Sequence, residues 1–444
     1  MDIDAKLSKQ LSQYVFRGIL STVGASIYVL ADSFFVAKSI GVLGVAVMNL
    51  TMPLFNIMEG LGLLLGMGGG TLFTIYHIKH QEKARSIFTQ TFIIGLLLGL
   101  FFTLCGIFFA PFIAHLLGAD TTTFSYTLEY VRIVLLFGPF FVFNNLLLSF
   151  VRNDKGTQIA MIAMIISSLA NIFLDWLLIL QFNLGMFGAG FATSMSPIIS
   201  IAITATHFRK KDNHLKFVHS KISPRQIFKA LAIGLPSFLT EMSTGVGIFI
   251  YNWVFLTVSG NDAVAAYGIA ANVLLVALAL FTGIAQGIQP IVSHQYALKN
   301  FKNIKFSLRF GLIVAEALGI LCLIFVCLNP NLIINFFNAS FNANVVHLAE
   351  NGMKILLTSL IFSSLNVVFN IFFSAIDNSR VSITMVVLRG YILPILIILP
   401  LAKFMGLHGV WISLLIIEIC SFLIELTTWS FMRRKLKQSI FTID

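Results

Sequence analysis

Two pairs of polar residues with helical spacing lie inside apolar runs of the sequence. Asn171 and Asp175 are four residues apart in "NIFLDWLLIL", and Tyr28 and Asp32 are four apart in "SIYVLADSFFV". Residues at positions i and i+4 share one face of a helix, so each pair would present one polar patch. An ionised carboxylate in hydrocarbon is costly and usually faces a polar interior. Such a group can carry a proton or, when ionised, bind a sodium ion.

These acids are expected to lie at one depth. Asp32 and Asp175 each precede the end of an apolar run by about five residues, which is about 7–8 Å at the rise of a helix. Thr193, near the start of a run that returns in the opposite direction, would reach the same level. The three helices would then form one polar cluster. The alternative is that each acid caps a helix end or extends its side chain to water.

Further acids lie within apolar runs. Glu241 stands alone near the middle of the run 227–258, where it is either a functional charge or a structural hydrogen-bonding group. Spacing does not show which of the remaining acids is most suited to a functional role; they are Glu59, Glu316, Glu418 and Glu425.

The composition is that of an integral membrane protein. Of the 444 residues, 58% are hydrophobic and only 11% are charged, whereas soluble domains carry about 25% charge. The net charge of +11 does not indicate nucleic-acid binding, because no basic soluble domain carries it. The four cysteines all lie in apolar runs, so we expect neither a disulfide framework nor a zinc site, and no cofactor.

The apolar runs are long enough for helices that cross a bilayer, which need about 20 residues each. They predict an all-α protein of twelve transmembrane helices: 14–37, 45–75, 89–111, 128–150, 158–180, 187–207, 227–258, 263–293, 307–328, 352–375, 382–402 and 408–431. Lys and Arg gather in alternate loops, which places both termini in the cytoplasm.

The two halves of the chain look related. "SIGVLGVAVMN" (39–49) resembles "VSGNDAVAAYG" (258–268) at a shift of 219 residues, and "LGMFGAG" (184–190) resembles "MGLHGVW" (405–411). Six helices in each half, in the same orientation, make a parallel repeat of the kind that secondary transporters use. We therefore predict an N-lobe (1–207), a basic cytoplasmic linker (208–226) and a C-lobe (227–444).

Several of these stretches together resemble one family over nearly the whole chain. They are "ADSFFVAKSIGVLGVAVMNLTMPL", "GGGTLFTIYHIKHQEKA", "NIFLDWLLI", "GMFGAGFATSMS" and "GLPSFLTEMS", and the family is multidrug and toxic compound extrusion (MATE), in its bacterial DinF- and MepA-like branch. The resemblance implies two six-helix lobes around a V-shaped cavity, with export driven by proton or sodium entry.

The resemblance also implies roles for residues at matching positions. It assigns an N-lobe cation site, with sodium or a proton at the two aspartates, to Tyr28, Asp32, Asn171, Asp175 and Thr193, with Asn145 as a neighbour. A C-lobe sodium site is not expected, because 353–375 lacks the helix-10 aspartate that such a site uses.

The sequence therefore predicts a cation-coupled antiporter rather than an enzyme, in the bacterial plasma membrane and as a monomer. Its cargo would be amphipathic and often cationic, with Glu241 as the counter-charge. One alternative is a flippase for a lipid-linked oligosaccharide, which should line its cavity with Arg or Lys, but only Arg389 and Arg132 lie in the runs. The other alternative is a membrane enzyme, but the sequence contains no set of a nucleophile and a base that would support one.

Overall fold

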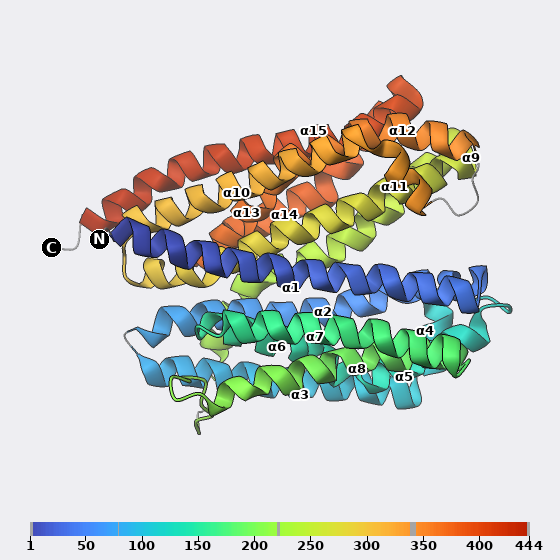
Figure 1. Cartoon of the computed structure of the whole chain (residues 1–444). Coiled ribbons are helices and arrows are strands. Elements are labelled where there is room, and N and C mark those ends of the chain that lie inside the picture. Colours follow the sequence, from blue (N-terminus) through green and yellow to red (C-terminus); the bar gives the residue numbers. More distant parts are fainter. Residues whose placement is uncertain (1–2, 79, 220–222, 338–342, 442–444) are drawn as a thin grey trace. The chain divides into compact units, whose positions relative to one another are not determined.

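The computed structural model describes residues 3–78, 80–219, 223–337 and 343–441, and these residues form helices and no strand (Figure 1). The elements of the first half are α1 (Ile3–Ser39), α2 (Val42–His77), α3 (Gln81–Phe108), α4 (Ala110–Leu116), α5 (Phe124–Leu136), α6 (Gly138–Asn153), α7 (Thr157–Asp175), the π-helical η1 (Trp176–Gln181), α8 (Gly185–Ala205) and η2 (Thr206–Arg209). Those of the second half are α9 (Pro224–Ala297), α10 (Phe301–Leu328), α11 (Pro330–Phe337), α12 (Ala343–Leu357), α13 (Leu360–Ala375), α14 (Ser379–Val387), the π-helical η3 (Leu388–Ile392) and α15 (Leu393–Phe441).

The membrane-crossing segments agree with the expected twelve. Among the described residues, nine helices are long and apolar enough to cross a bilayer, and two bent helix pairs raise the number to eleven. One of the eleven, Ser379–Met432, has 54 residues, which at about 1.5 Å per residue is more than twice the thickness of the hydrocarbon core. Its chain leaves the helical conformation at Gly406, where φ is 57°. This segment therefore crosses twice.

Turns at matching positions support the internal repeat. Gly41 and Gly260, which a shift of 219 superimposes, adopt φ values of 77° and 76°. Gly185 and Gly406, from the second pair of similar stretches, adopt 56° and 57°. A residue with a Cβ is strained at positive φ, so glycine is suited to these sharp turns. The bent pairs match as well, with α5 and α6 meeting at 50° and α12 and α13 at 46°.

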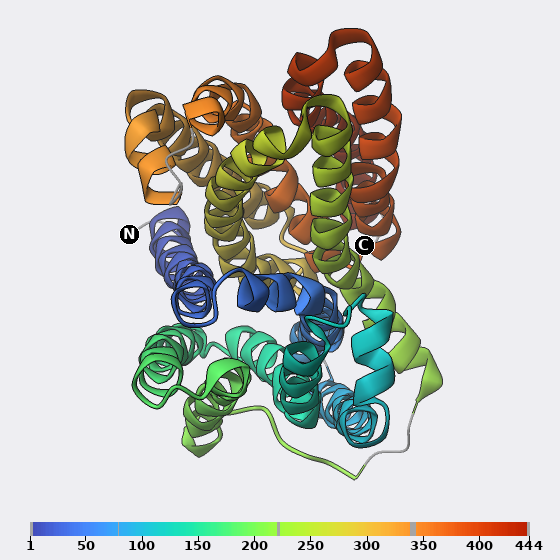
Figure 2. The same cartoon turned by 90° about the vertical axis from the view of Figure 1, so that its right-hand side faces the viewer.

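Packing divides the chain into two compact units, and each is a bundle of long helices (Figure 2). One unit is Leu20–Met242, and the other combines Met1–Ile19 with Ser243–Asp444. These boundaries fall inside α1 and α9, so that each of these two helices contributes residues to both units. The expected lobes at 1–207 and 227–444, joined by a linker at 208–226, remain a prediction.

The basic linker is attached to the first unit by Asp154. The Asp154 carboxylate lies 2.8 Å from His207 Nε2 and 2.8 Å from His214 Nδ1, and it accepts a hydrogen bond from the His214 amide at 3.0 Å. Burial acts to raise the pKa of Asp154, but these hydrogen bonds outweigh it and hold the pKa below its ordinary value. Asp154 is therefore most strongly bound to the linker as a carboxylate.

The glycines of "GMGGG" (66–70) allow close contact between helices. A Cβ at Gly66 would lie 2.8 Å from the Asn145 carbonyl oxygen of α6, and one at Gly70 would lie 2.8 Å from the Asn153 side chain. A Cβ at Gly234 of α9 would lie 2.7 Å from the Leu64 carbonyl carbon of α2. The motif lies inside α2 and brings neighbouring backbones together, as small residues do in membrane proteins.

Candidate functional site

Three helices of the first unit bring Asp32, Asp175 and Thr193 together. Thr193 Oγ1 on α8 donates a hydrogen bond to Asp32 Oδ2 on α1 at 3.3 Å. Asp175, the last residue of α7, lies near enough to Asp32 for the two charges to interact. Asp32 is 4% exposed and Asp175 is fully buried. The expected convergence of these three residues at one level is therefore present in the structure.

The cluster contains buried polar atoms that the described protein does not pair. They are Asp32 Oδ1, both carboxylate oxygens of Asp175, and both side-chain polar atoms of Asn171. A buried polar group without a hydrogen bond costs about 1–3 kcal/mol, and more if it is charged. Protonation neutralises such a carboxylate, and a hard cation such as sodium binds to oxygen atoms. The arrangement is chemically suited to either.

The backbone changes its winding directly after Asp175. The α-helix α7 ends there, and the chain continues as the π-helical η1. A π-helical turn is rare and often marks a functional position within a helix. Gly188 of α8 packs against this turn, since a Cβ at that position would lie 3.1 Å from the Leu178 backbone. Asp175 therefore lies where its helix is locally distorted.

Two tyrosines border the aspartates. Tyr28, one turn before Asp32 on α1, lies within electrostatic reach of Glu59 and of both aspartates. Tyr130 of α5 is 1% exposed, and its hydroxyl lies beside Thr193 and within reach of the same charges. Tyr130 was not among the predicted residues. No spacing in the sequence links it to the other helices, and the only available signal was a tyrosine in a mostly apolar run.

Asn145 lies elsewhere in the first unit. It packs against α2, where a Cβ on Gly62 would lie 2.9 Å from Asn145 Cβ. Within the described residues, no recorded interaction connects Asn145 with the aspartates. Its assignment as a site neighbour remains a prediction, and the local contacts indicate helix packing instead.

Glu241 has an acidic neighbour that spacing did not predict. It lies on α9 where that helix passes α2, so that a Cβ on Gly60 would be 3.5 Å from Glu241 Cβ. Glu59, the residue before this glycine, lies close enough for its charge to interact with that of Glu241. The first unit therefore contains a second pair of carboxylates, separate from Asp32 and Asp175 in sequence.

The corresponding position of the second half is neutral. The shift that superimposes Gly41 on Gly260 places Tyr251 at the position of Asp32. The Tyr251 hydroxyl lies 2.9 Å from Ser413 Oγ, and this contact joins α9 to α15 as the contact between Asp32 and Thr193 joins α1 to α8. The two hydroxyls satisfy each other and carry no charge.

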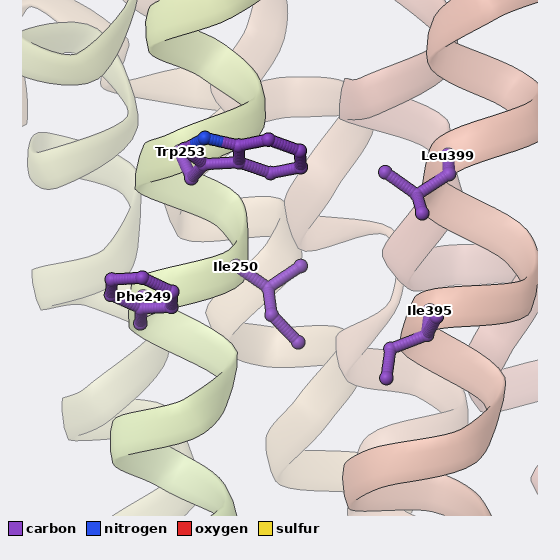
Figure 3. Close-up of a pocket in the computed structure, with 5 residues that line it drawn as sticks. All are labelled: Phe249, Ile250, Trp253, Ile395 and Leu399. Carbon is purple, nitrogen blue, oxygen red and sulfur yellow. The ribbon is translucent and has the colours of Figure 1, made fainter.

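An apolar groove lies between α9 and α15 in the second unit (Figure 3). Its volume is about 320 Å³. Phe249 and Trp253 on its wall are 72% and 53% exposed. The remaining lining residues are Ile250, Ile395 and Leu399. The groove offers aliphatic and aromatic surface without a charged side chain among these lining residues.

Comparison with known proteins identifies the family. The sequence model of the MatE family matches residues 19–177 and 236–399, which together are well over half of the chain. The chain belongs to the MatE family. This MATE chain is 29% identical to "Multidrug export protein MepA" of Staphylococcus saprophyticus over 391 residues, which cover 86% of the chain and 85% of that relative. It is 27% identical to the protein of that name in Staphylococcus aureus over 414 residues, covering 92% and 90%.

Solved structures share the fold of this MATE chain. An outward-facing multidrug resistance MATE family transporter superimposes with a TM-score of 0.90 at 23% identity, with 97% of each chain covered. A MATE protein in complex with MaL6 gives 0.92 at 22% identity, covering 99% of this chain and 100% of that one. The family match makes the chain a multi-pass membrane transporter and not an enzyme, and these structures share its fold.

Proposed function

We propose that this MATE chain exports amphipathic, often cationic small molecules, and that entry of a proton or a sodium ion at Asp32 and Asp175 drives the export. One observation carries the proposal: two buried carboxylates interact with each other, while three of their four oxygens have no hydrogen-bond partner among the described residues. The names of the MepA relatives, which describe multidrug export, support the direction and the type of cargo.

The cluster can couple ion binding to a change of state. When Asp32 and Asp175 are ionised, their charges repel and require water, which favours a state that admits solvent. A bound proton or sodium ion removes that requirement and favours a closed packing of α1, α7 and α8. A ligand shifts such an equilibrium only by its difference in affinity for the two states. A desolvated carboxylate pair provides this difference.

The cargo would be recognised by charge and by apolar contact. Glu241 and Glu59 together offer a negative site for an organic cation. The groove lined by Phe249 and Trp253 offers aromatic surface, which also attracts cations. Each of these features lies within a single unit, and we propose each as a separate contact for amphipathic cargo.

The flippase alternative is less well supported. A pyrophosphate group requires basic side chains that are free to contact it. Arg389 is already bound to Glu418 through two nitrogens, and Arg132 is exposed on α5. Neither supplies a buried basic site of the kind that such a substrate needs.

Dye efflux from vesicles tests the proposed coupling. The purified protein would be reconstituted, and proton and sodium gradients would be imposed separately. We expect one gradient to drive dye movement in the wild type and in Asp212→Asn, whose carboxylate is exposed in the linker. Asp32→Asn and Asp175→Asn should not respond. Equal transport by these two variants, or transport without either gradient, would contradict the proposal.

A further inference from the structure

A second buried charge cluster lies in the second unit, and its residue Glu418 lies within electrostatic reach of Tyr251. Arg389 of η3 donates to Glu418 of α15 from Nε at 2.9 Å and from Nη2 at 2.8 Å. Asn366 of α13 donates to the same carboxylate at 2.6 Å. Glu418 is 3% exposed. Three elements hold this pair, and both carboxylate oxygens of Glu418 accept hydrogen bonds.

Glu425 adds a second carboxylate to this cluster. It lies two helical turns after Glu418 on the same face of α15, it is 1% exposed, and its Oε2 atom has no partner in the described protein. The charges that act on it are those of Arg389 and Glu418. Ser421 Oγ, between the two acids on that face, is likewise buried and unpaired.

The charges of the cluster do not balance. Arg389 contributes one positive charge, while Glu418 and Glu425 would contribute two negative charges if both were ionised. An unpaired ionised carboxylate away from water costs several kcal/mol, and the group avoids this cost by binding a positive charge. A metal cation here would be repelled by the adjacent guanidinium. A proton on Glu425 avoids that repulsion and creates an O–H donor beside Ser421.

Among the described residues, the other elements that pack against α15 supply no cation to Glu425. On α12, Lys354 is paired with Glu350 at 3.4 Å. On α14, Arg380 is exposed. Asn366, the polar residue that α13 contributes to the cluster, is neutral and is already bound to Glu418.

The local backbone matches that of the first cluster. Arg389 lies within a π-helical turn, as Asp175 lies directly before one. The two turns lie on corresponding helices of the repeat, each of them the fifth of the six helices in its half. We propose that Glu425 is a proton-binding site of the second half, distinct from the Asp32–Asp175 cluster, and that the Arg389–Glu418 pair holds the charge environment of this site fixed.

Infrared difference spectroscopy on the whole protein in lipid tests this proposal. A protonated carboxyl group has a C=O stretching band that the carboxylate lacks, so the difference between acidic and alkaline samples reports carboxyl protonation. We expect Glu425→Gln to lose one such band that the wild type retains. Glu82→Gln, at an exposed position of α3, should keep it, and so should the Asp32→Asn/Asp175→Asn double variant.

Two further measurements separate the alternatives. Glu425→Asp should shift the band instead of removing it, so this variant decides the question if the Gln variant does not fold. Adding sodium at constant pH should leave the band unchanged. The proposal would be overturned if the C=O stretching region of the difference spectrum were identical in the wild type and both Glu425 variants. Loss of the band on sodium addition would also overturn it, because the site would then bind a metal cation.

Discussion

At the scale of single residues, the aspartates of the first unit are surrounded by neutral polar groups. Thr193 donates to Asp32, and Asn171, Tyr28 and Tyr130 complete the surroundings without contributing a cation. Helical spacing was sufficient to predict the pairs on α1 and α7, because i,i+4 geometry is local. Tyr130 could not be predicted, since its position depends on how α5 packs against α8.

We expect Asp175→Asn to reduce efflux to the background of cells that lack the protein, while the protein still folds in the membrane. Asparagine has nearly the same shape but cannot bind a proton or hold the charge that attracts a cation. Drug resistance and protein level in the membrane fraction are the measurements, with Asp212→Asn as the control. Wild-type resistance at a normal protein level would exclude a coupling role for this residue.

Asp32→Asn should have the same effect, and the double variant should be no worse than either single one. Residues that act as one coupled site give losses that do not add. The measurement is the initial rate of dye efflux from the three variants at matched expression. Partial defects that add would indicate that the two aspartates bind ions independently.

Glu241→Gln should narrow the range of cargo but leave ion coupling in place. The charge of Glu241 interacts with that of Glu59, which also lies within electrostatic reach of Tyr28. We expect loss of Glu241 to weaken export of cationic dyes several-fold while neutral dyes are still exported. Glu59→Gln should act in the same direction. Equal loss for neutral and cationic dyes would instead place the coupling ion at Glu241.

At the scale of elements, glycine determines how closely α2 approaches α6 and α9. The sequence shows small residues at "GMGGG" (66–70), which favour close packing of transmembrane helices, and no Lys of a phosphate-binding loop follows them. It could not identify Gly234 as the partner on α9. That contact joins residues far apart in the chain and leaves no periodic signal.

Gly234→Ala should destabilise the protein, by about 1–3 kcal/mol for overpacking, because the new methyl group would meet the Leu64 backbone. Gly247 lies in the same helix, and a methyl group added there would have no atom within 4 Å. Gly247→Ala should therefore leave stability unchanged or raise it by up to about 1 kcal/mol. Thermal unfolding in detergent compares the two variants. An unchanged Tm for Gly234→Ala would show that α2 and α9 can separate at little cost.

The contact of Asp154 with the linker should depend on pH. The pKa of Asp154 is held below its ordinary value in the folded state. Its stabilising contribution is therefore present above about pH 4, the pKa of an unfolded aspartate, and is lost as pH falls through the lower folded-state pKa. Asp154→Asn should remove about 1–3 kcal/mol near neutral pH.

Limited proteolysis of the linker near His214 measures this loss. Cleavage of Asp154→Asn should be faster than cleavage of the wild type, and Asp212→Asn should match the wild type. Identical cleavage of all three proteins would show that other contacts hold the linker in place.

At the scale of the whole molecule, the two halves share turns but not charges. The repeat was predictable because glycines that form sharp turns keep their spacing, as Gly41 and Gly260 do. The shift of 219 residues also predicted that the neutral Tyr251 takes the position of Asp32 in the second half. The Arg389–Glu418 pair was not predictable, because its residues lie on different helices and have no shared period.

The neutral surroundings of Asp32 and Asp175 have a consequence for the energy source of transport. If both carboxylates are filled from outside, two positive charges enter in each cycle, and each gains about 2.3 kcal/mol per 100 mV of membrane potential. Export of a monovalent cation would then move one net charge inward and be driven partly by voltage. Export of a divalent cation would move none. The charge of the cargo would thus decide whether the electrical part of the gradient contributes to pumping at all.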